Sequence, residues 1–214
     1  MTIGSKRARL GVAAAVLSVC ASRPVAAQPP AGQAPTGHEH HMAMTTPDPA
    51  TAVKKPQVMG SQPKLDGIML VDAAGKSVAL GDALSADTPV LLNFIFTTCT
   101  TICPVMTAGF SQLEGRLATD HRPVRLVSIS IDPEIDTPAA LRRYATEHKA
   151  GSDWVFLTGT PASSEAAQRA FGAYRGGKES HAPITFIRRT RTGPWEQLDG
   201  LASGESLHRA YLGE

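Results

Sequence analysis

Apolar segments of strand length alternate along the chain with segments in which apolar residues recur at helical spacing. The run PVLLNFIF, residues 89–96, is apolar at almost every position, which is typical of a central strand buried on both faces. The run VRLVSISI, residues 124–131, is a second predicted strand. Between the two runs, apolar residues at helical spacing predict a helix over 106–117. A strand, a helix and a strand in this order predict a parallel unit of an α/β fold.

Further elements are predicted on both sides of this unit. Residues 67–84 hold two apolar runs joined by Ala73-Ala74-Gly75-Lys76, which indicates a β-hairpin. Thr137 followed by Pro138 indicates the N-cap and the first residue of a helix. We therefore expect one α/β domain over 58–214. Its remaining predicted elements are a strand at 154–159, a helix at 163–174, two strands joined across Gly193-Pro194 within 183–198, and a helix at 203–211.

The start of the chain has the features of a secretory signal rather than of a folded domain. In residues 1–27 a cluster of Lys and Arg precedes an apolar run at 10–21, and small residues precede the expected cleavage site after Ala27. The apolar run is shorter than the about 20 residues of a membrane-spanning helix. We expect an exported protein of the bacterial periplasm or of the periplasmic face of the membrane. Membrane association would come from a lipidated Cys20 or from an uncleaved signal.

The charge of the chain argues against a nucleic-acid partner. The formal net charge is +2, and four basic residues lie before Gln28, whereas the first acidic residue is Glu39. Removal of the signal would therefore leave a small negative charge. The exported chain would have no basic face with interleaved aromatic residues, which is the pattern of nucleic-acid binding.

Residues 28–57 are predicted to be a disordered tether. They are rich in Pro, Ala, Thr and Gly and nearly lack bulky apolar side chains, so they bury too little surface to offset the entropy of ordering. The tether contains HEHHMAM, whose imidazole and thioether groups are candidate auxiliary copper ligands: His38, His40, His41, Met42 and Met44. The alternative is a polar tract without a specific role.

Candidate chemistry is concentrated in FTTCTTICPVM, residues 96–106, which contains Cys99 and Cys103. Cys99 follows a predicted buried strand and Cys103 enters the next helix. Ligand sites in open α/β sheets lie beyond the carboxyl ends of the strands. Two sulfurs at this spacing can converge on one metal ion or form a disulfide, and a helix N-terminus favours thiolate over thiol. A metal site, a redox pair and an inert disulfide all stay open, although a disulfide across so short a loop stabilises little.

A metal ion held by both cysteines needs a third ligand, and the candidate is His181 in KESHAPITF, just before a predicted strand. Two thiolates and one imidazole form a soft donor set suited to Cu(I), which also accepts Cu(II). The alternative is a loop histidine without a metal role. Asp132 and Asp136, in the loop after a predicted strand, are assigned turn and capping roles, and the alternative is that they lie near the site and support its ligands. The other histidines of the domain are assigned to its surface: His121, His148 and His208.

Four segments taken together resemble the Sco/SenC family of copper-binding, thioredoxin-like proteins: FTTCTTICPVM, LVSISIDPEIDTPAALRRYA, DWVFLTG and SHAPITFI. The resemblance covers residues 63–212. It implies a thioredoxin-like central sheet flanked by helices with an added N-terminal β-hairpin, and copper held by Cys99, Cys103 and His181. It also implies a role in assembling the binuclear copper site of a cytochrome oxidase. The partner would be the copper-receiving oxidase subunit or another copper chaperone.

Three features bear on the choice between copper delivery and redox chemistry. Thr100-Thr101-Ile102 stands where the family commonly has Pro and an acidic residue between its cysteines. Ser180 stands where the family commonly has Asp, and if that Asp orients the imidazole, another group must do so here. Pro183 is reminiscent of the cis-proline of thiol-disulfide enzymes.

The alternative function is a thiol-disulfide oxidoreductase that keeps target cysteines of a copper protein reduced, with Cys99 as the attacking and Cys103 as the resolving thiol. The familiar redox motif has two residues between its cysteines rather than three. We therefore expect a metallochaperone rather than an enzyme. Peroxide reduction on the same scaffold has the least support.

Overall fold

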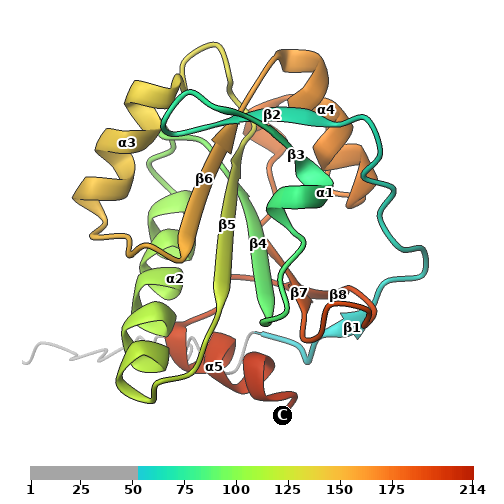
Figure 1. Ribbon diagram of the computed structural model, residues 1–214, viewed down its shortest axis with the longest axis vertical. Helices are drawn as coiled ribbons and strands as arrows, with labels where there is room; N and C mark the ends of the chain where they lie inside the picture. Colours follow the sequence, from blue (N-terminus) through green and yellow to red (C-terminus); the bar gives the residue numbers. More distant parts are fainter. Residues whose placement is uncertain (1–52) are drawn as a thin grey trace, which may run out of the picture. The chain divides into compact units, whose positions relative to one another are not determined.

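The computed structural model describes residues 53–214, which form a mixed eight-stranded sheet with helices on both faces (Figure 1). The strands lie in the order β1-β8-β7-β4-β5-β6-β2-β3. They are β1 (Gln57–Val58), β2 (Met69–Asp72), β3 (Ser77–Ala79), β4 (Val90–Ile95), β5 (Arg125–Ser130), β6 (Trp154–Thr158), β7 (Ile184–Arg188) and β8 (Glu196–Asp199). The helices are α1 (Leu80–Ala83), α2 (Ile102–Thr119), α3 (Pro138–Glu147), α4 (Pro161–Ala170), α5 (Gly204–Leu212) and the 3-10 helix η2 (Lys178–Ser180).

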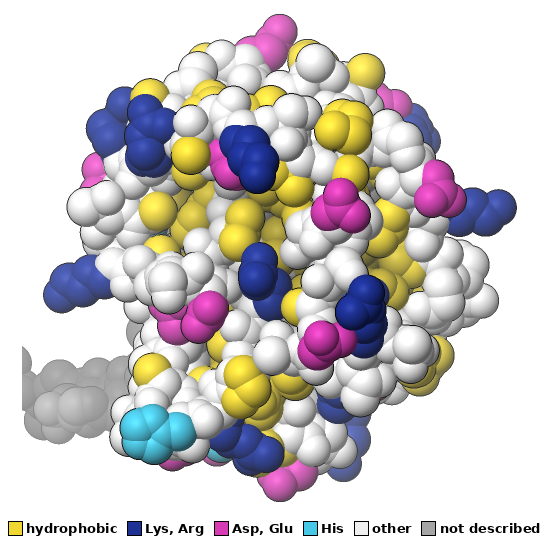
Figure 2. Space-filling view, in the orientation of Figure 1, with side chains coloured by type: hydrophobic (Ala, Val, Ile, Leu, Met, Phe, Trp, Pro, Cys, Tyr) yellow, Lys and Arg dark blue, Asp and Glu magenta, His cyan; other side chains and the backbone are white. Residues whose placement is uncertain are grey.

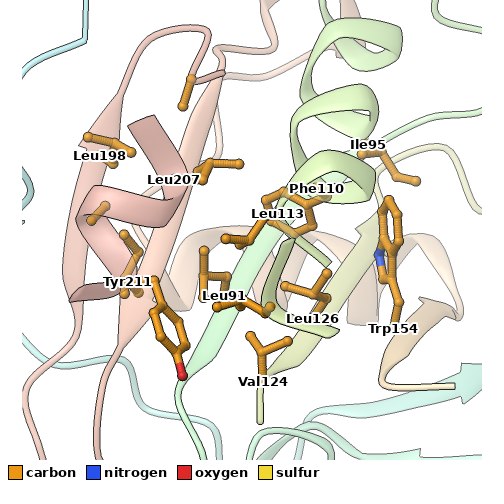
Figure 3. Close-up of a cluster of buried hydrophobic side chains, with 14 of the residues drawn as sticks. Leu91, Ile95, Phe110, Leu113, Val124, Leu126, Trp154, Leu198, Leu207 and Tyr211 are labelled. Atoms are coloured by element: carbon orange, nitrogen blue, oxygen red, sulfur yellow. The ribbon is translucent and has the colours of Figure 1, made fainter. Parts of the chain in front are cut away.

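The sheet divides the core into two layers because successive side chains of a strand point to opposite faces. In β4, Leu91 and Ile95 pack under α2, α3 and α5, in the cluster drawn in Figure 3. Leu92 and Phe94 pack on the other face with side chains of α1 and α4. All four are essentially inaccessible to solvent, and burying each contributes about 1.5–3 kcal/mol. The continuous apolar run of this strand therefore reflects burial on both faces, as the sequence predicts.

The parallel unit expected around the cysteines is confirmed. β4 and β5 are parallel in the register Leu91↔Leu126, and β5 and β6 are parallel in the register Val127↔Val155. The predicted hairpin is confirmed as β2 and β3, and β2 extends the sheet by antiparallel pairing with β6. The hairpin is thus an addition to the edge of the sheet next to β6.

Some boundaries differ from the sequence-based expectation. α4 begins at Pro161 rather than 163, because the Thr160 hydroxyl accepts a hydrogen bond from the Ser163 amide in a capping box. It ends at Ala170 rather than 174, and Gly172 adopts a left-handed conformation (φ 64°) just beyond the end. α1, η2 and β1 were not predicted. β1 begins at Gln57, the last residue assigned to the tether, and pairs with β8.

The strand directions bring three loops together at the end of the sheet where β4 and β5 finish: the loop after β4, the loop after β5 and the loop before β7. β4 and β5 are parallel, so their carboxyl ends meet there, and β7 is antiparallel to β4 in the register Asn93↔Thr185. The segment that enters β7 therefore lies beside the segment that leaves β4. The first segment contains His181, and the second contains Cys99.

The surface shown in Figure 2 carries basic and acidic side chains in a mixed distribution over a background with small apolar areas. Among residues 53–214, no helix combines the length and the hydropathy needed to cross a membrane.

Candidate metal site at the carboxyl end of β4

The residues that follow β4 form a tight turn that brings the two cysteines together. We refer to residues 96–103 as the cysteine turn. The Cys99 amide donates to the Phe96 carbonyl oxygen at 3.1 Å, and the Cys103 amide donates to Cys99 Sγ at 3.4 Å. Both are free cysteines, with Cys99 half-buried and Cys103 buried. Pro104 follows in the first turn of α2, where its missing amide hydrogen would have no helical partner.

The two thiols differ in acidity. Burial favours a higher pKa for Cys99, but hydrogen bonds from Cys103 and Thr101 outweigh it, so its pKa lies below the ordinary value. Burial raises the pKa of Cys103 to about 12, and the nearby Cys99 and Asp136 add to the rise. The helix N-terminus was expected to favour thiolate, but for Cys103 burial dominates. In the metal-free protein Cys99 is therefore the reactive thiol, and a metal ion would have to displace the proton of Cys103.

Asp136 anchors the cysteine turn from the loop between β5 and α3. Its carboxylate is completely buried and accepts hydrogen bonds from the Thr97 amide at 3.2 Å, the Thr97 hydroxyl at 2.5 Å and the Ser130 hydroxyl at 2.6 Å. The turn and capping role assigned from the sequence therefore misses its main contacts. The N-cap of α3 is Thr137, whose hydroxyl accepts from the Ala140 amide as predicted.

His181 lies directly after η2, in the segment that enters β7. Its side chain is half-buried, and Nε2 is a buried atom without a hydrogen-bond partner among residues 53–214. Burial lowers the pKa of His181, and a hydrogen bond with the Phe94 backbone offsets part of the shift. The neutral imidazole is the form that binds metal ions, so this environment suits a ligand.

The contacts of Lys178 and Phe96 connect the His181 segment to the loop after β5 and to the cysteine turn. Lys178 of η2 pairs with Asp132 after β5, with 2.5 Å between Nζ and Oδ2. The same Nζ lies 5.8 Å from the centroid of the Phe96 ring, and His181 packs edge-on against that ring at a centroid distance of 6.4 Å. Phe96 therefore touches the histidine through its ring and Cys99 through its carbonyl oxygen. The sequence analysis missed Lys178 because Asp132 is 46 residues away in the chain.

The predicted ligands are neighbours, but they do not form a closed site. Cys99 and Cys103 are in contact, whereas residues 53–214 contain no group of three His, Cys, Asp or Glu side chains close enough to share a metal ion. For one ion to contact all three residues, His181 and the cysteine turn must move towards each other. Two sulfurs and an imidazole nitrogen without a partner nevertheless match the soft donor set of copper.

Some of the remaining residues singled out in the sequence lie within the described residues 53–214, and others lie outside them. Ser180 is exposed, and every peptide bond in the described part of the chain is trans, including the one before Pro183. The signal, Cys20 and the tether candidates lie outside the described residues: His38, His40, His41, Met42 and Met44.

Comparison with known sequences decides the family. The profile of the SCO1/SenC family matches residues 66–190, which is more than half of the chain. The chain belongs to the SCO1/SenC family. It is 41% identical over 102 residues to a SCO1 protein homolog of Bacillus subtilis strain 168, covering 46% of the chain and 52% of the relative. It is 35% identical over 83 residues to a protein of Stutzerimonas stutzeri named as a candidate copper-binding protein, covering 38% of the chain and 40% of the relative.

Solved structures agree with this assignment. BsSco, a member of the Sco family of cytochrome c oxidase assembly proteins in which a disulfide switch was identified, superposes with a TM-score of 0.59 at 26% identity. The match covers 75% of this chain and 94% of BsSco. The thioredoxin-like fold and the resemblance to the Sco/SenC family are therefore confirmed. The chain spans about half or less of the length of the two relatives compared by sequence.

Proposed function

We propose that this SCO1/SenC protein is a copper metallochaperone that assists assembly of the binuclear copper site of a cytochrome oxidase. Cys99, Cys103 and His181 would hold the copper ion. The observation that carries the proposal is the proximity, at one sheet edge, of a thiol of lowered pKa and a histidine whose Nε2 has no partner. The similarity to the candidate copper-binding protein of S. stutzeri supports copper binding, and the similarity to BsSco, of the Sco family of cytochrome c oxidase assembly proteins, supports a role in oxidase assembly.

The unequal thiols suit a protein that binds copper and then gives it up. Cys99 would offer a thiolate to an incoming ion, and Cys103 would lose its proton as the ion binds. His181 would add a neutral nitrogen ligand. With this nitrogen, the set of two sulfurs and one imidazole would also accept Cu(II). Copper would pass to the copper-receiving subunit of the oxidase, or come from another copper chaperone, by exchange of these ligands.

A second function, thiol-disulfide exchange, is favoured by the same difference in acidity. The Cys99 thiolate would attack a disulfide of a copper protein, forming a mixed disulfide and releasing one target thiolate. Cys103, after losing its proton, would then attack Cys99 Sγ, releasing the second target thiolate and leaving Cys99 and Cys103 oxidised as a disulfide. The target would thereby be reduced by two electrons. The disulfide switch named for BsSco supports this chemistry in the family.

The remaining proposals concern export and the tether. The basic and apolar start of the chain supports export to the periplasm, with a lipidated Cys20 or a retained signal as the membrane anchor. The tether ligands would collect additional copper: His38, His40, His41, Met42 and Met44. Deleting residues 28–56 should then lower the total copper capacity without unfolding the domain. Unchanged stoichiometry would reduce the tether to a spacer.

The test is an anaerobic Cu(I) competition titration of the reduced protein, with and without residues 28–56. The parent should bind one tight equivalent in the domain. Cys99→Ser, Cys103→Ser and His181→Ala should each weaken it by more than about 100-fold, because loss of a ligand exceeds the 10–100-fold effect of an outer partner. The matched control is His121→Asn, an exposed histidine whose left-handed backbone (φ 51°) asparagine tolerates.

The titration also separates the two functions. Equal Cu(I) affinity in His181→Ala and the parent would remove His181 as a ligand. Weak binding by the parent would favour the oxidoreductase function. Under that function, His181→Ala should exchange disulfides at the parental rate, because only the two sulfurs take part.

A further inference from the structure

The segment that carries His181 has few connections to the rest of the domain. η2 is closed by two backbone hydrogen bonds, Ser180 to Gly177 at 3.1 Å and His181 to Lys178 at 3.2 Å. Within the described part of the chain, the hydrogen bond and ion pair from Lys178 to Asp132 is the one polar side-chain tie between residues 176–182 and another loop. His181 itself makes a hydrogen bond with the Phe94 backbone, and the Lys178–Asp132 pair holds η2, the segment directly before it, to the loop after β5.

Asp132 is a fixed anchor rather than a mobile surface carboxylate. Its side chain is 10% exposed, against 38% for Lys178. Its amide donates to the Ser130 hydroxyl at 3.0 Å, and its carbonyl oxygen accepts from the Asp136 amide at 2.8 Å. The same loop thus holds the cysteine turn through Asp136 and the His181 segment through Asp132. Exposed ion pairs contribute little, but a pair with one buried partner is more sensitive to loss of either charge.

The contacts of Phe96 relate this pair to the cysteines. The Lys178 ammonium group lies near the Phe96 ring, which is a favourable arrangement for a cation, and His181 packs against the edge of that ring. Loss of the Lys178 contacts would therefore release η2 and leave the imidazole held by the Phe96 ring and by its hydrogen bond with the Phe94 backbone. Ser180, directly before His181, is exposed and leaves the orientation of the imidazole to other groups.

We propose that Lys178 and Asp132 are positioning residues that set the place of His181 relative to Cys99 and Cys103. The inference rests on the proposed function, in which His181 is a ligand. The ion pair would limit the range of positions available to the histidine before copper arrives. Fixing the third ligand would then cost less conformational entropy when the copper ion binds.

The first measurement uses the metal-free, reduced full chain. Carbethoxylation of His181 by diethyl pyrocarbonate is followed by peptide mass mapping, which separates this histidine from the others. His181 should react slowly in the parent because its Nε2 is buried, and about tenfold faster in Lys178→Gln and in Asp132→Asn. The double variant should match the single variants, and Lys178→Arg should restore the parental rate. The matched control is Arg191→Gln, which removes the exposed Arg191–Asp87 pair.

The second measurement is the Cu(I) affinity of the same variants. Lys178→Gln and Asp132→Asn should bind about tenfold more weakly, in the range expected for groups that orient a metal ligand. Reaction rates and affinities equal to those of Arg191→Gln would overturn the positioning role, and Lys178→Gln decides this even if Asp132→Asn folds poorly. If His181→Ala leaves the Cu(I) affinity unchanged, the ligand role itself is wrong, whatever the carbethoxylation rates show.

Discussion

The cysteine turn and the His181 segment meet where His181 packs against the Phe96 ring, but they are held in different ways. Three backbone amides of the cysteine turn donate hydrogen bonds that fix it: Cys99 to the Phe96 carbonyl oxygen, Cys103 to Cys99 Sγ and Thr97 to the Asp136 carboxylate. The His181 segment is held by the Lys178–Asp132 ion pair, by the ring contact with Phe96 and by the hydrogen bond of His181 with the Phe94 backbone. The two cysteines are therefore held by a turn with a buried anchor, Asp136, whereas the segment before His181 is held through the partly exposed Lys178 side chain.

This difference suits a protein that must bind a metal ion and then release it. A site closed on all sides would hold copper too firmly for transfer to a partner. Under the proposed function, the cysteines would stay in place and release of copper would begin with the less constrained histidine. The comparison predicts that substitutions near the cysteine turn affect folding and reactivity, while those near η2 affect the position of His181.

The largest effect should follow from removing the anchor of the cysteine turn. Asp136→Ala leaves the half-buried Thr97 amide and hydroxyl and the buried Ser130 hydroxyl without their acceptor. We expect the free energy of unfolding to fall by about 3 kcal/mol, measured by urea denaturation. The control is Asp153→Ala at an exposed position, which should change it by less than about 0.5 kcal/mol. Equal stability of the two variants would show that Asp136 is no anchor.

The second-largest effect should be the difference between the alkylation rates of the two thiols. Iodoacetamide should modify Cys99 at least about 100-fold faster than Cys103 at pH 7, because the pKa of Cys99 is lowered and that of Cys103 is raised to about 12. Cys103→Ser retains the amide that donates to Cys99 Sγ, so Cys99 should react within about twofold of the parental rate. Similar rates for both thiols in the parent would contradict the assigned asymmetry.

The raised pKa of Cys103 also predicts how stability depends on pH. The folded state holds this proton more tightly than the unfolded state, so stability is full below about pH 9 and falls as the pH rises towards 12. The slope from this one proton is at most about 1.4 kcal/mol per pH unit. Denaturation of the metal-free parent and of Cys103→Ala between pH 8 and 11 checks this, where the variant should show the shallower loss. Parallel curves would exclude the effect.

The smallest effect concerns the hydroxyl next to Cys99. Thr101 Oγ1 lies 3.7 Å from Cys99 Sγ, and its hydrogen bond contributes to the lowered pKa. Thr101→Val should therefore slow alkylation of Cys99 at pH 7 by about threefold, as suits a weak sulfur hydrogen bond. Thr100→Val, at an exposed neighbouring position, should leave the rate unchanged. A similar slowing in both variants would point to a general change in the turn.

Local signals carried much of the fold and part of the site. The apolar run of β4, the Thr137 cap and the hairpin turn at Gly75 were readable because each depends on neighbours in the sequence. Cys99, Cys103 and the histidine before β7 were found from their place relative to predicted strands. The capping box of Thr160 and Ser163 was also visible in the sequence, and using it would have corrected the start of α4.

Long-range contacts were not predictable in the same way. Asp136 reaches Thr97 across 39 residues, and Lys178 reaches Asp132 across 46. Neither pair has a local pattern, because the contacts arise only when parallel β4 and β5 and antiparallel β7 meet at one sheet edge. The pairing of β1 with β8 depends equally on the assembled sheet. The sequence thus indicated the candidate ligands, and Asp132 and Asp136 as residues that could lie near them, but not the contacts with Thr97 and Lys178.

X-ray absorption at the copper edge of the reduced protein lacking residues 28–56, loaded with one equivalent of Cu(I), tests the central claim most directly. The account predicts a first shell of two sulfur atoms and one nitrogen atom in the parent, and loss of the nitrogen in His181→Ala. His121→Asn should match the parent. A shell of sulfur alone in the parent, or a nitrogen that persists in His181→Ala, would contradict the three-ligand site.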